Sequence, residues 1–358
     1  MRVLQSFTEG RSTTNPYLVQ LVSALRPRTV VLGFSWRRAL LGRYDVLHLH
    51  WPERLCRGTT PARSRARRML LRALLLRLRL GRVAVVRTLH NQSPHEEVVE
   101  AEAAILRRLD ALTTLWISLN PATTRPAAAR PGSPLVMIPH GDYRAWFERM
   151  PRPAPTPGRL VFAGLIRPYK GVEALIAAFT ALPDDSLTLR IVGEPASPDL
   201  ADAIRESSEL DHRITHEFEY LADADLAEEI GRAELVVLPY RKMHNSGAAL
   251  LALSLERPVL VPANEVTEWL ASEVGSGWVE TYVGSLSPDV LARAINRVRE
   301  TSRSDAPDLS RRTWPAIAER HREAYDTAAQ LEAERRRLRH RRHQPAWASM
   351  KPARFRAR

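Results

Sequence analysis

Short apolar segments alternate with helix-like segments along most of the chain. In the first half, the apolar segments lie near residues 2–7, 29–35, 46–51, 84–90, 111–117 and 135–139. A second series lies at residues 160–166, 187–193, 214–220, 235–239, 258–262 and 277–283. Strands that alternate with helices are typical of parallel sheets whose two faces are covered by helices. The pattern therefore predicts an α/β protein with two parallel-sheet domains that face a cleft.

A proline-rich segment separates the two series. Residues 151–158 contain four prolines, and proline continues neither a helix nor a central strand, so we expect a hinge there. We predict an N-terminal domain over residues 1–150, a C-terminal domain over 159–310 and a terminal helix over 311–330. The remaining residues, 331–358, are polar and rich in arginine, and this composition predicts a basic, disordered tail.

One turn of the second series carries two positive charges. Gly164 and Gly171 bound this turn, and Arg167 and Lys170 lie within it, between an apolar segment and a helical pattern. Glycines let the backbone approach a ligand, the helix N-terminus offers free N–H groups, and two cations can face an anion. The spacing predicts a phosphate site, and an ordinary strand-to-helix turn with two solvated cations is the alternative.

These residues resemble the donor-phosphate turn of the family 4 (group 1) glycosyltransferases, in which an Arg and a Lys bind the diphosphate of a nucleotide sugar. Further motifs occur in the family's order, at residues 48–53, 88–91, 138–141, 192–194, 237–240 and 257–262. The resemblance covers roughly residues 1–330. It implies a GT-B fold, in which two Rossmann-like domains face each other and a C-terminal helix crosses back to the first domain.

The resemblance also implies a set of donor-binding residues, in which Asn245 or Ser246 alternatively serve only as helix caps. They are Gly164, Arg167, Lys170, Glu194, Tyr240, Asn245, Ser246, Gly247 and His140. The chain departs from the retaining members of the family, because the two positions of their Glu-x7-Glu pair are Met243 and Leu251. The Asn-Ser-Gly loop is similar to that of bacterial β-mannosyl and β-glucuronosyl transferases of exopolysaccharide or glycolipid assembly, which favours inversion.

Inversion requires a base on the acceptor side. His90, at the end of a predicted strand, is the first candidate because histidine titrates in the useful range, and Glu96 in the next predicted helix is the second. His90 could instead bond local backbone, and Glu96 could act as a first-turn charge. His50, Glu53 and Glu9 are further candidates for the base. Other side chains at strand ends or helix starts are predicted on the acceptor side, and Asn15 is alternatively a helix cap. They are Asn15, Tyr17, His50 and Glu53.

Composition limits the other possibilities. The single cysteine, Cys56, excludes an intrachain disulfide framework. The first residues predict a strand rather than a signal peptide, and no apolar run reaches about 18 residues. We therefore expect a cytoplasmic protein, peripheral at most on the inner face of the cell membrane. Asp223 and Asp225 open a predicted helix and are expected to stabilise its start rather than bind metal, so we expect neither metal nor cofactor.

The net charge of +13 is mostly arginine and favours anionic partners. A predicted helix within residues 63–80 places arginines on one face and leucines on another. These residues are Arg65, Arg68, Arg72 and Arg79, and Leu71, Leu74, Leu75 and Leu78. The segment is either an in-plane contact with an anionic membrane surface or a helix that covers its own sheet with a solvated basic face.

Three functions compete. The first is a metal-independent, inverting transfer of a hexose from a nucleotide-diphosphate sugar, GDP-mannose by preference, to a lipid-linked or polysaccharide acceptor. The second is a retaining transferase or a nucleotide-sugar epimerase on the same fold. The third is a non-catalytic polyanion-binding protein. Nucleic acid is not an expected partner, because the chain has no recognised nucleic-acid module and no basic stripe interleaved with aromatic residues.

Overall fold

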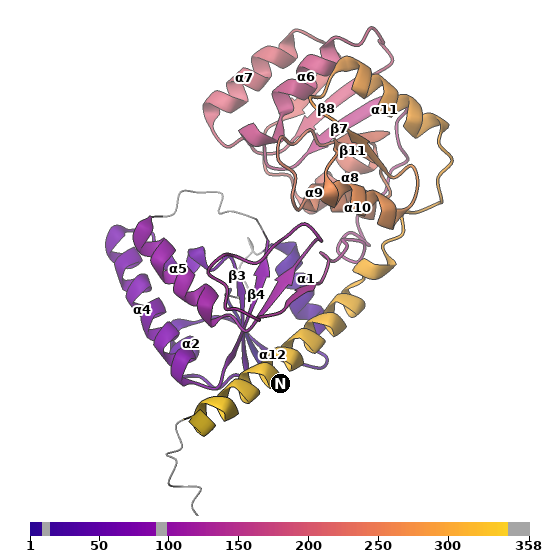
Figure 1. Ribbon diagram of the computed structural model, residues 1–358. Helices are drawn as coiled ribbons and strands as arrows, with labels where there is room; N and C mark the ends of the chain where they lie inside the picture. Colours follow the sequence, from indigo (N-terminus) through magenta and orange to yellow (C-terminus); the bar gives the residue numbers. More distant parts are fainter. Residues whose placement is uncertain (9–14, 91–98, 343–358) are drawn as a thin grey trace, which may run out of the picture.

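The computed structural model describes residues 1–8, 15–90 and 99–342. It consists of two parallel sheets, each with helices on both faces (Figure 1). The first sheet has the order β2-β1-β3-β4-β5-β6 and the second the order β12-β11-β10-β7-β8-β9. All pairings within both sheets are parallel. The predicted α/β class is confirmed.

The strands fall on the predicted apolar segments. Those of the first sheet are β1 (Arg2–Gln5), β2 (Val30–Leu32), β3 (Val46–His50), β4 (Ala84–Leu89), β5 (Leu115–Ser118) and β6 (Leu135–Met137). Those of the second sheet are β7 (Arg159–Ala163), β8 (Thr188–Val192), β9 (Ile214–Glu217), β10 (Leu235–Val237), β11 (Val259–Pro262) and β12 (Val279–Tyr282). Every residue of β3 is buried, as expected for a central strand with helices on both faces.

Helices connect the strands. In the first domain they are α1 (Pro16–Leu25), α2 (Trp36–Leu41), α3 (Glu53–Cys56), α4 (Pro61–Leu80) and α5 (Glu100–Leu112). In the second they are α6 (Val172–Thr180), α7 (Pro198–Glu209), α8 (Asp223–Gly231), α9 (Gly247–Ser254), α10 (Glu265–Val274) and α11 (Pro288–Glu300). Two 3-10 turns, η1 (Pro168–Lys170) and η2 (Ser310–Arg312), and the long helix α12 (Trp314–Arg342) complete the chain.

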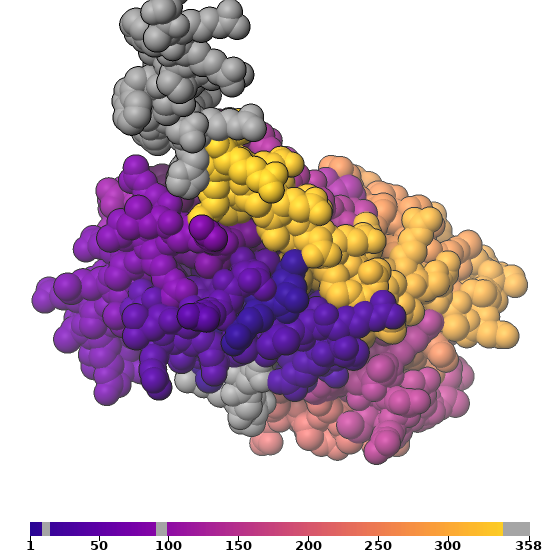
Figure 2. Space-filling model, turned by 90° about the horizontal axis from the view of Figure 1, so that it is seen from below, coloured from indigo at the N-terminus to yellow at the C-terminus, as the bar shows by residue number. Residues whose placement is uncertain are grey.

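The helix α12 crosses back to the first domain. Its residues Trp314, Ile317 and Tyr325 belong to the same buried cluster as α1 and the first sheet. Figure 2 shows α12 along the outside of the molecule, against the N-terminal domain. The helices α2, α4 and α5 share a separate buried cluster with the first sheet and lie on the side away from α12 (Figure 1).

The structure corrects two predicted boundaries. Tyr143 and Phe147 pack in the core of the second domain, so the chain enters that domain before residue 150, because these aromatic side chains find their apolar partners there. The segment 151–158 itself has no helix or strand. The helix α12 continues past residue 330 to Arg342, where disorder was predicted. Glu332 contacts Arg335 and Arg336 one turn away, and such pairs stabilise helices.

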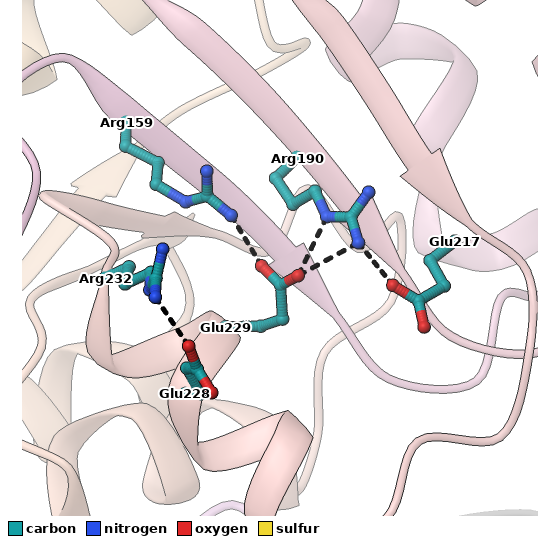
Figure 3. Close-up of polar contacts among 6 residues, drawn as sticks. All are labelled: Arg159, Arg190, Glu217, Glu228, Glu229 and Arg232. Carbon is teal, nitrogen blue, oxygen red and sulfur yellow. Dashed lines mark hydrogen bonds and ion pairs between the residues drawn. The ribbon is translucent and has the colours of Figure 1, made fainter. Parts of the chain in front are cut away.

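An ion-pair network ties the second sheet to α8 (Figure 3). The Glu229 carboxylate accepts hydrogen bonds from Arg159 Nη2 at 2.6 Å and from Arg190 Nε at 3.0 Å. Arg190 also contacts Glu217 at the end of β9. The three side chains of Arg159, Arg190 and Glu229 are each about one-fifth exposed. One carboxylate therefore neutralises two arginines that are largely withdrawn from solvent.

We predict that Glu229→Gln lowers the free energy of unfolding by about 1–3 kcal/mol, because it leaves the partly buried Arg159 guanidinium without its charged partner and leaves Arg190 paired with Glu217 alone. The matched control is Glu228→Gln, whose pair with Arg232 is about half exposed and is worth at most about 0.5 kcal/mol. Urea unfolding followed by circular dichroism measures both. Equal shifts in the midpoint for the two variants would contradict the importance of the Glu229 network.

Candidate active site

The carboxyl ends of the strands meet where the two domains touch, which is where parallel sheets place their ligands. The side-chain amide of Asn245, in the loop after β10, donates to the carbonyl oxygen of His90 at 2.7 Å. It also accepts a hydrogen bond from Asn120 at 2.8 Å. His244 contacts the hydroxyl of Thr123 at 2.8 Å. Loop 238–247 of the second domain is thus attached to the strand that ends at His90.

Five histidines gather on the first-domain side of this junction. His48 and His50 lie on β3, His90 follows β4, His140 follows β6 and His321 comes from α12. The ring centroids of His48 and His50 are 4.1 Å apart, and those of His50 and His90 are 5.2 Å apart. His140 reaches the cluster through Tyr17, whose ring lies 4.6 Å from it and 5.4 Å from His90. The predicted residues Tyr17, His50, His90 and His140 are therefore neighbours.

A chain of hydrogen bonds sets which nitrogens of His50 and His90 carry protons. Gln5 Oε1 lies 3.1 Å from His50 Nε2, and His50 Nδ1 lies 2.9 Å from His90 Nε2. An amide oxygen only accepts, so His50 Nε2–H donates to Gln5. A neutral His50 then has its lone pair on Nδ1 and accepts from His90 Nε2–H. The proton of His90 is held on Nε2, and its lone pair is on Nδ1.

Burial keeps these imidazoles neutral. Desolvation lowers the pKa of His50 to about 3 and that of His140 to about 4. It also holds the pKa of His90 well below its ordinary value, with nearby His50 as a second cause. A neutral imidazole with a free lone pair can accept a proton, whereas an imidazolium cannot. The cluster therefore presents His90 in the form that a general base requires.

Trp51 fixes the plane of the His90 ring. The two rings are stacked, with centroids 3.8 Å apart and an interplanar angle of 20°. Trp51 has a backbone φ of 46°, a left-handed conformation that costs a bulky residue energy and occurs where the surrounding structure enforces it. The guanidinium group of Arg54 lies over the Trp51 ring, 5.4 Å from its centroid. The strained turn after β3 thus positions the aromatic ring beside the candidate base.

The remaining acceptor-side predictions have different outcomes. Asn15 caps α1, since its side-chain oxygen accepts from the backbone N–H of Tyr17 at 2.9 Å. Tyr17 is buried, and its hydroxyl has no hydrogen-bond partner among the described residues. Glu53 is the first residue of the short helix α3. Glu9 and Glu96 lie outside the described residues. The acceptor-binding roles of these residues stay predictions.

On the second-domain side, the predicted phosphate turn has the expected shape. It runs from the end of β7 through η1 to Gly171, which has a φ of 69°. A Cβ at Gly171 would lie 2.4 Å from the carbonyl oxygen of Pro239, so only glycine fits. Lys170 Nζ lies 5.0 Å from the centroid of the Tyr240 ring. The turn and loop 238–247 therefore form one surface.

The two cations of this turn have no anionic partner in the part of the chain that the structure describes. Within residues 1–8, 15–90 and 99–342, neither Arg167 nor Lys170 forms an ion pair. Burial, with Arg167 as a second cause, lowers the pKa of Lys170 to about 8. A group whose charged form is disfavoured in the free protein gains most when an anion arrives. These features suit a diphosphate.

The other predicted donor residues surround this turn. Glu194 follows β8 with an exposed side chain, and its carbonyl oxygen accepts from Ile166 N at 2.9 Å. Ser246 caps α9 by accepting from Ala249 N at 3.1 Å, and Gly247 begins that helix. The side chain of Asn245 forms hydrogen bonds with His90 and Asn120 of the first domain. The donor-binding roles of these residues stay predictions.

Asp223 behaves as the sequence predicts. It is the first residue of α8, and its carboxylate accepts from Trp146 Nε1 at 2.9 Å. In the part of the chain that the structure describes, no three His, Cys, Asp or Glu side chains are grouped so that they could hold a metal ion.

Sequence reasoning missed several members of the site. They are Gln5, His48, Trp51, Asn120, Thr123, His244, His321 and Tyr325. Tyr325 bonds His48 Nδ1 at 2.8 Å from a helix about 280 positions away in sequence. One signal was available, because Trp314, Ile317, His321 and Tyr325 recur at the spacing of one buried helix face.

Comparisons with known proteins agree with this architecture. Residues 157–301 match the family described as "Glycosyl transferases group 1". Two proteins from Xanthomonas campestris pv. campestris, both named GDP-mannose:glycolipid 4-beta-D-mannosyltransferase, are each 45% identical over 323 residues. That match covers 90% of this chain and 91% of each relative.

Solved structures share the fold. The Anabaena protein HepE in complex with UDP matches with a TM-score of 0.56 and 14% identity, over 95% of this chain and 100% of that chain. AviGT4, a glycosyltransferase of avilamycin A biosynthesis, matches with a TM-score of 0.57 and 16% identity, over 92% and 98%. These are GT-B glycosyltransferase structures, so the predicted GT-B fold is confirmed. With an identity of 45% over nine-tenths of two named relatives, the chain belongs to the group 1 glycosyltransferases.

Proposed function

We propose that this glycosyltransferase moves mannose from GDP-mannose to a glycolipid acceptor, with inversion at the anomeric carbon. The observation that supports it most directly is the hydrogen bond between Asn245 and the His90 carbonyl, because it holds the candidate base next to the loop that packs on the phosphate turn. The donor and acceptor come from the names of the two relatives that are 45% identical.

The proposed reaction is a single displacement. The acceptor oxygen attacks the anomeric carbon, the bond from that carbon to the diphosphate breaks, and GDP leaves. The acceptor proton passes to His90 Nδ1. Arg167 and Lys170 neutralise the negative charge that develops on the diphosphate. A β product from an α-linked donor requires inversion, and the "beta" in the relatives' name agrees with that outcome.

The missing glutamate pair supports inversion too. Met243 is buried in the second core, and Leu251 packs against the same core. Neither position supplies a carboxylate beside the donor sugar. The proton acceptor must then come from the first domain, where His90 is neutral. Because the proposed acceptor is a lipid, we also propose that the enzyme works at the cytoplasmic surface of a membrane. None of the described helices is both long and apolar enough to cross one.

Removing both cations should strongly weaken donor binding. We expect Arg167→Ala with Lys170→Ala to weaken GDP binding by about 100-fold or more, because hydrogen bonds to charged groups contribute roughly 1.5–3 kcal/mol each. Titration calorimetry with GDP, UDP and ADP measures the affinity for each nucleotide and identifies the nucleobase that the site prefers. Preference for UDP or ADP would contradict the GDP-mannose proposal, and unchanged GDP affinity in the double variant would contradict the assigned phosphate site.

GDP affinity should also fall as pH rises through the range from 8 to 10. Lys170 must be protonated to bind phosphate, and its pKa is lowered to about 8 in the free protein. Above that pH, binding takes up a proton, and the affinity falls by up to about tenfold per pH unit. Lys170→Arg is the control, because guanidinium stays charged. The same pH profile in both proteins would show that Lys170 is not the titrating group.

The hydrogen-bond chain to His90 should affect turnover rather than donor binding. We expect His90→Leu to lower kcat by about 100-fold to 10,000-fold. His50→Leu removes the acceptor for His90 Nε2–H and should lower kcat by about tenfold or more, whereas His50→Asn retains an acceptor and should recover part of the loss. In both leucine variants the GDP affinity should change little.

The matched control is His321→Leu, a buried histidine of the same cluster whose ring, among the residues that the structure describes, bonds only the Ile317 carbonyl of its own helix. A loss of kcat in His321→Leu as large as in His50→Leu would mean that packing, not the hydrogen-bond chain, sets the activity.

A further inference from the structure

The structure separates the leucines of α4 from a second apolar set on the same helix. Leu71, Leu74, Leu75 and Leu78 are buried in the cluster that covers the first sheet. Met69, Leu76 and Leu80 are instead 66%, 58% and 74% exposed. The core therefore takes only the first set. The sequence left two alternatives for this helix, a membrane contact or a cover for its own sheet. Both can hold, because one set of side chains packs in the core and another faces outward.

The exposed apolar side chains share their face with arginines. At 100° per residue, Arg65, Met69, Arg72, Leu76, Arg79 and Leu80 all lie within one arc of about 100°. We call these six residues the outer stripe of α4. Apolar and cationic side chains alternate along it over more than four turns. Such a face is poorly suited to water alone, because more than half of each apolar side chain is exposed to solvent.

The neighbouring helix α2 extends this surface. Leu41, its last residue, is 80% exposed, and Arg37 and Arg38 are exposed as well. Gly42 follows directly and accepts a hydrogen bond from Arg77 of α4, which places Leu41 near the C-terminal end of the outer stripe. Figure 1 shows α2, α4 and α5 together on the side of the first domain away from α12.

The charge of this surface is uncompensated. No Asp or Glu occurs between Glu53 and Glu96, whereas residues 54–87 contain eleven arginines. Within the described residues, Glu102 is buried and pairs with Arg57 and Arg68, and the arginines of the outer stripe form no ion pair. The surface thus offers several cations to an anionic partner at close spacing.

A groove runs along one edge of the stripe, between α4 and α5. Its volume is about 580 Å³. It is lined by three arginines, Arg72 and Arg79 from α4 and Arg108 from α5, and by the apolar side chains of Leu75, Leu76, Ala111 and Leu112. Guanidinium groups beside apolar side chains complement a phosphodiester joined to hydrocarbon, which is the chemistry of a phospholipid at the interface of a bilayer.

We infer that the outer stripe of α4, with Leu41, lies in the interface of an anionic phospholipid membrane. Arginines meet the lipid phosphates, while Met69, Leu76 and Leu80 enter the acyl boundary. Charge and apolar exposure on one helix favour lipid over nucleic acid, because the stripe has no aromatic side chain on which bases could stack.

This orientation would bring the site to the acceptor. α3 and α4 follow β3 directly, so the N-terminal end of α4 starts near the strand end that carries His50. An acceptor whose lipid is anchored in the same bilayer would then present its sugar beside the histidine cluster. Only this last step rests on the proposed function, since lipid binding can be measured without turnover.

The test is sedimentation of the full chain with vesicles of phosphatidylcholine alone or with 30% phosphatidylglycerol. Wild type should bind the anionic vesicles. Arg65→Gln, Arg72→Gln and Arg79→Gln together should weaken that binding by about 100-fold. Met69→Ser, Leu76→Ser and Leu80→Ser together should weaken it by about tenfold or more. The control replaces three exposed arginines of the second half of the chain, Arg205, Arg232 and Arg311, by Gln and should bind like wild type.

Two results would overturn the inference. One is full binding to anionic vesicles by the charge variant, in which Arg65, Arg72 and Arg79 are replaced by Gln. That result would mean that other arginines, such as those near the C-terminus, bind the lipid. The other is strong binding of single-stranded DNA through the outer stripe with none to vesicles. Turnover on a detergent-dispersed acceptor should be the same in the charge variant and wild type, so a failure of the proposed transferase activity is distinguishable from a failure of lipid binding.

Discussion

The first sheet depends on a helix from the opposite end of the chain. A parallel sheet is stable only when both faces are covered, and one face of this sheet is covered by α1 together with α12. Tyr325 of α12 is fully buried and bonds both His48 and Gln5. The C-terminal helix therefore completes the core of the first domain. Through Tyr325 it also bonds Gln5, the first member of the hydrogen-bond chain that leads to His90.

This coverage explains why so many histidines are buried together. His48 on β3 bonds Tyr325 of α12, while His50 and His90 bond each other, and all three side chains are buried. Their imidazoles are neutral and satisfy one another, Gln5, Thr88 and Tyr325 instead of solvent. The hydrogen-bond chain from Gln5 through His50 leaves the lone pair of His90 on Nδ1. Burial, hydrogen bonding and the proposed chemistry are therefore consequences of one packing arrangement.

The two halves of the molecule use charge in different ways. In the second domain, most arginines of the sheet are paired, as in the network around Glu229 (Figure 3). Arg167 and Lys170 stand apart from these pairs and suit the diphosphate of a substrate. In the first domain, the arginines of α4 outnumber any acidic partner and lie beside exposed apolar side chains. The paired arginines stabilise the second sheet, Arg167 and Lys170 suit a small anion, and the arginines of α4 suit an extended anionic surface.

The sequence by itself determined the strands, the helices and the glycine-bounded turn, because these features depend on residues that are neighbours in the chain. The alternation of apolar and helical segments predicted both sheets, and the glycines at 164 and 171 predicted the turn between β7 and α6, because strand burial and positive φ angles follow from local chemistry. Tertiary structure alone decided the rest. It brought Gln5, His50 and His90 into one hydrogen-bond chain, joined Asn245 to His90, moved Tyr143 into the second core, and turned Leu76 outward while Leu75 went inward. These outcomes depend on contacts between residues far apart in the chain, which no local pattern of hydrophobicity or spacing encodes.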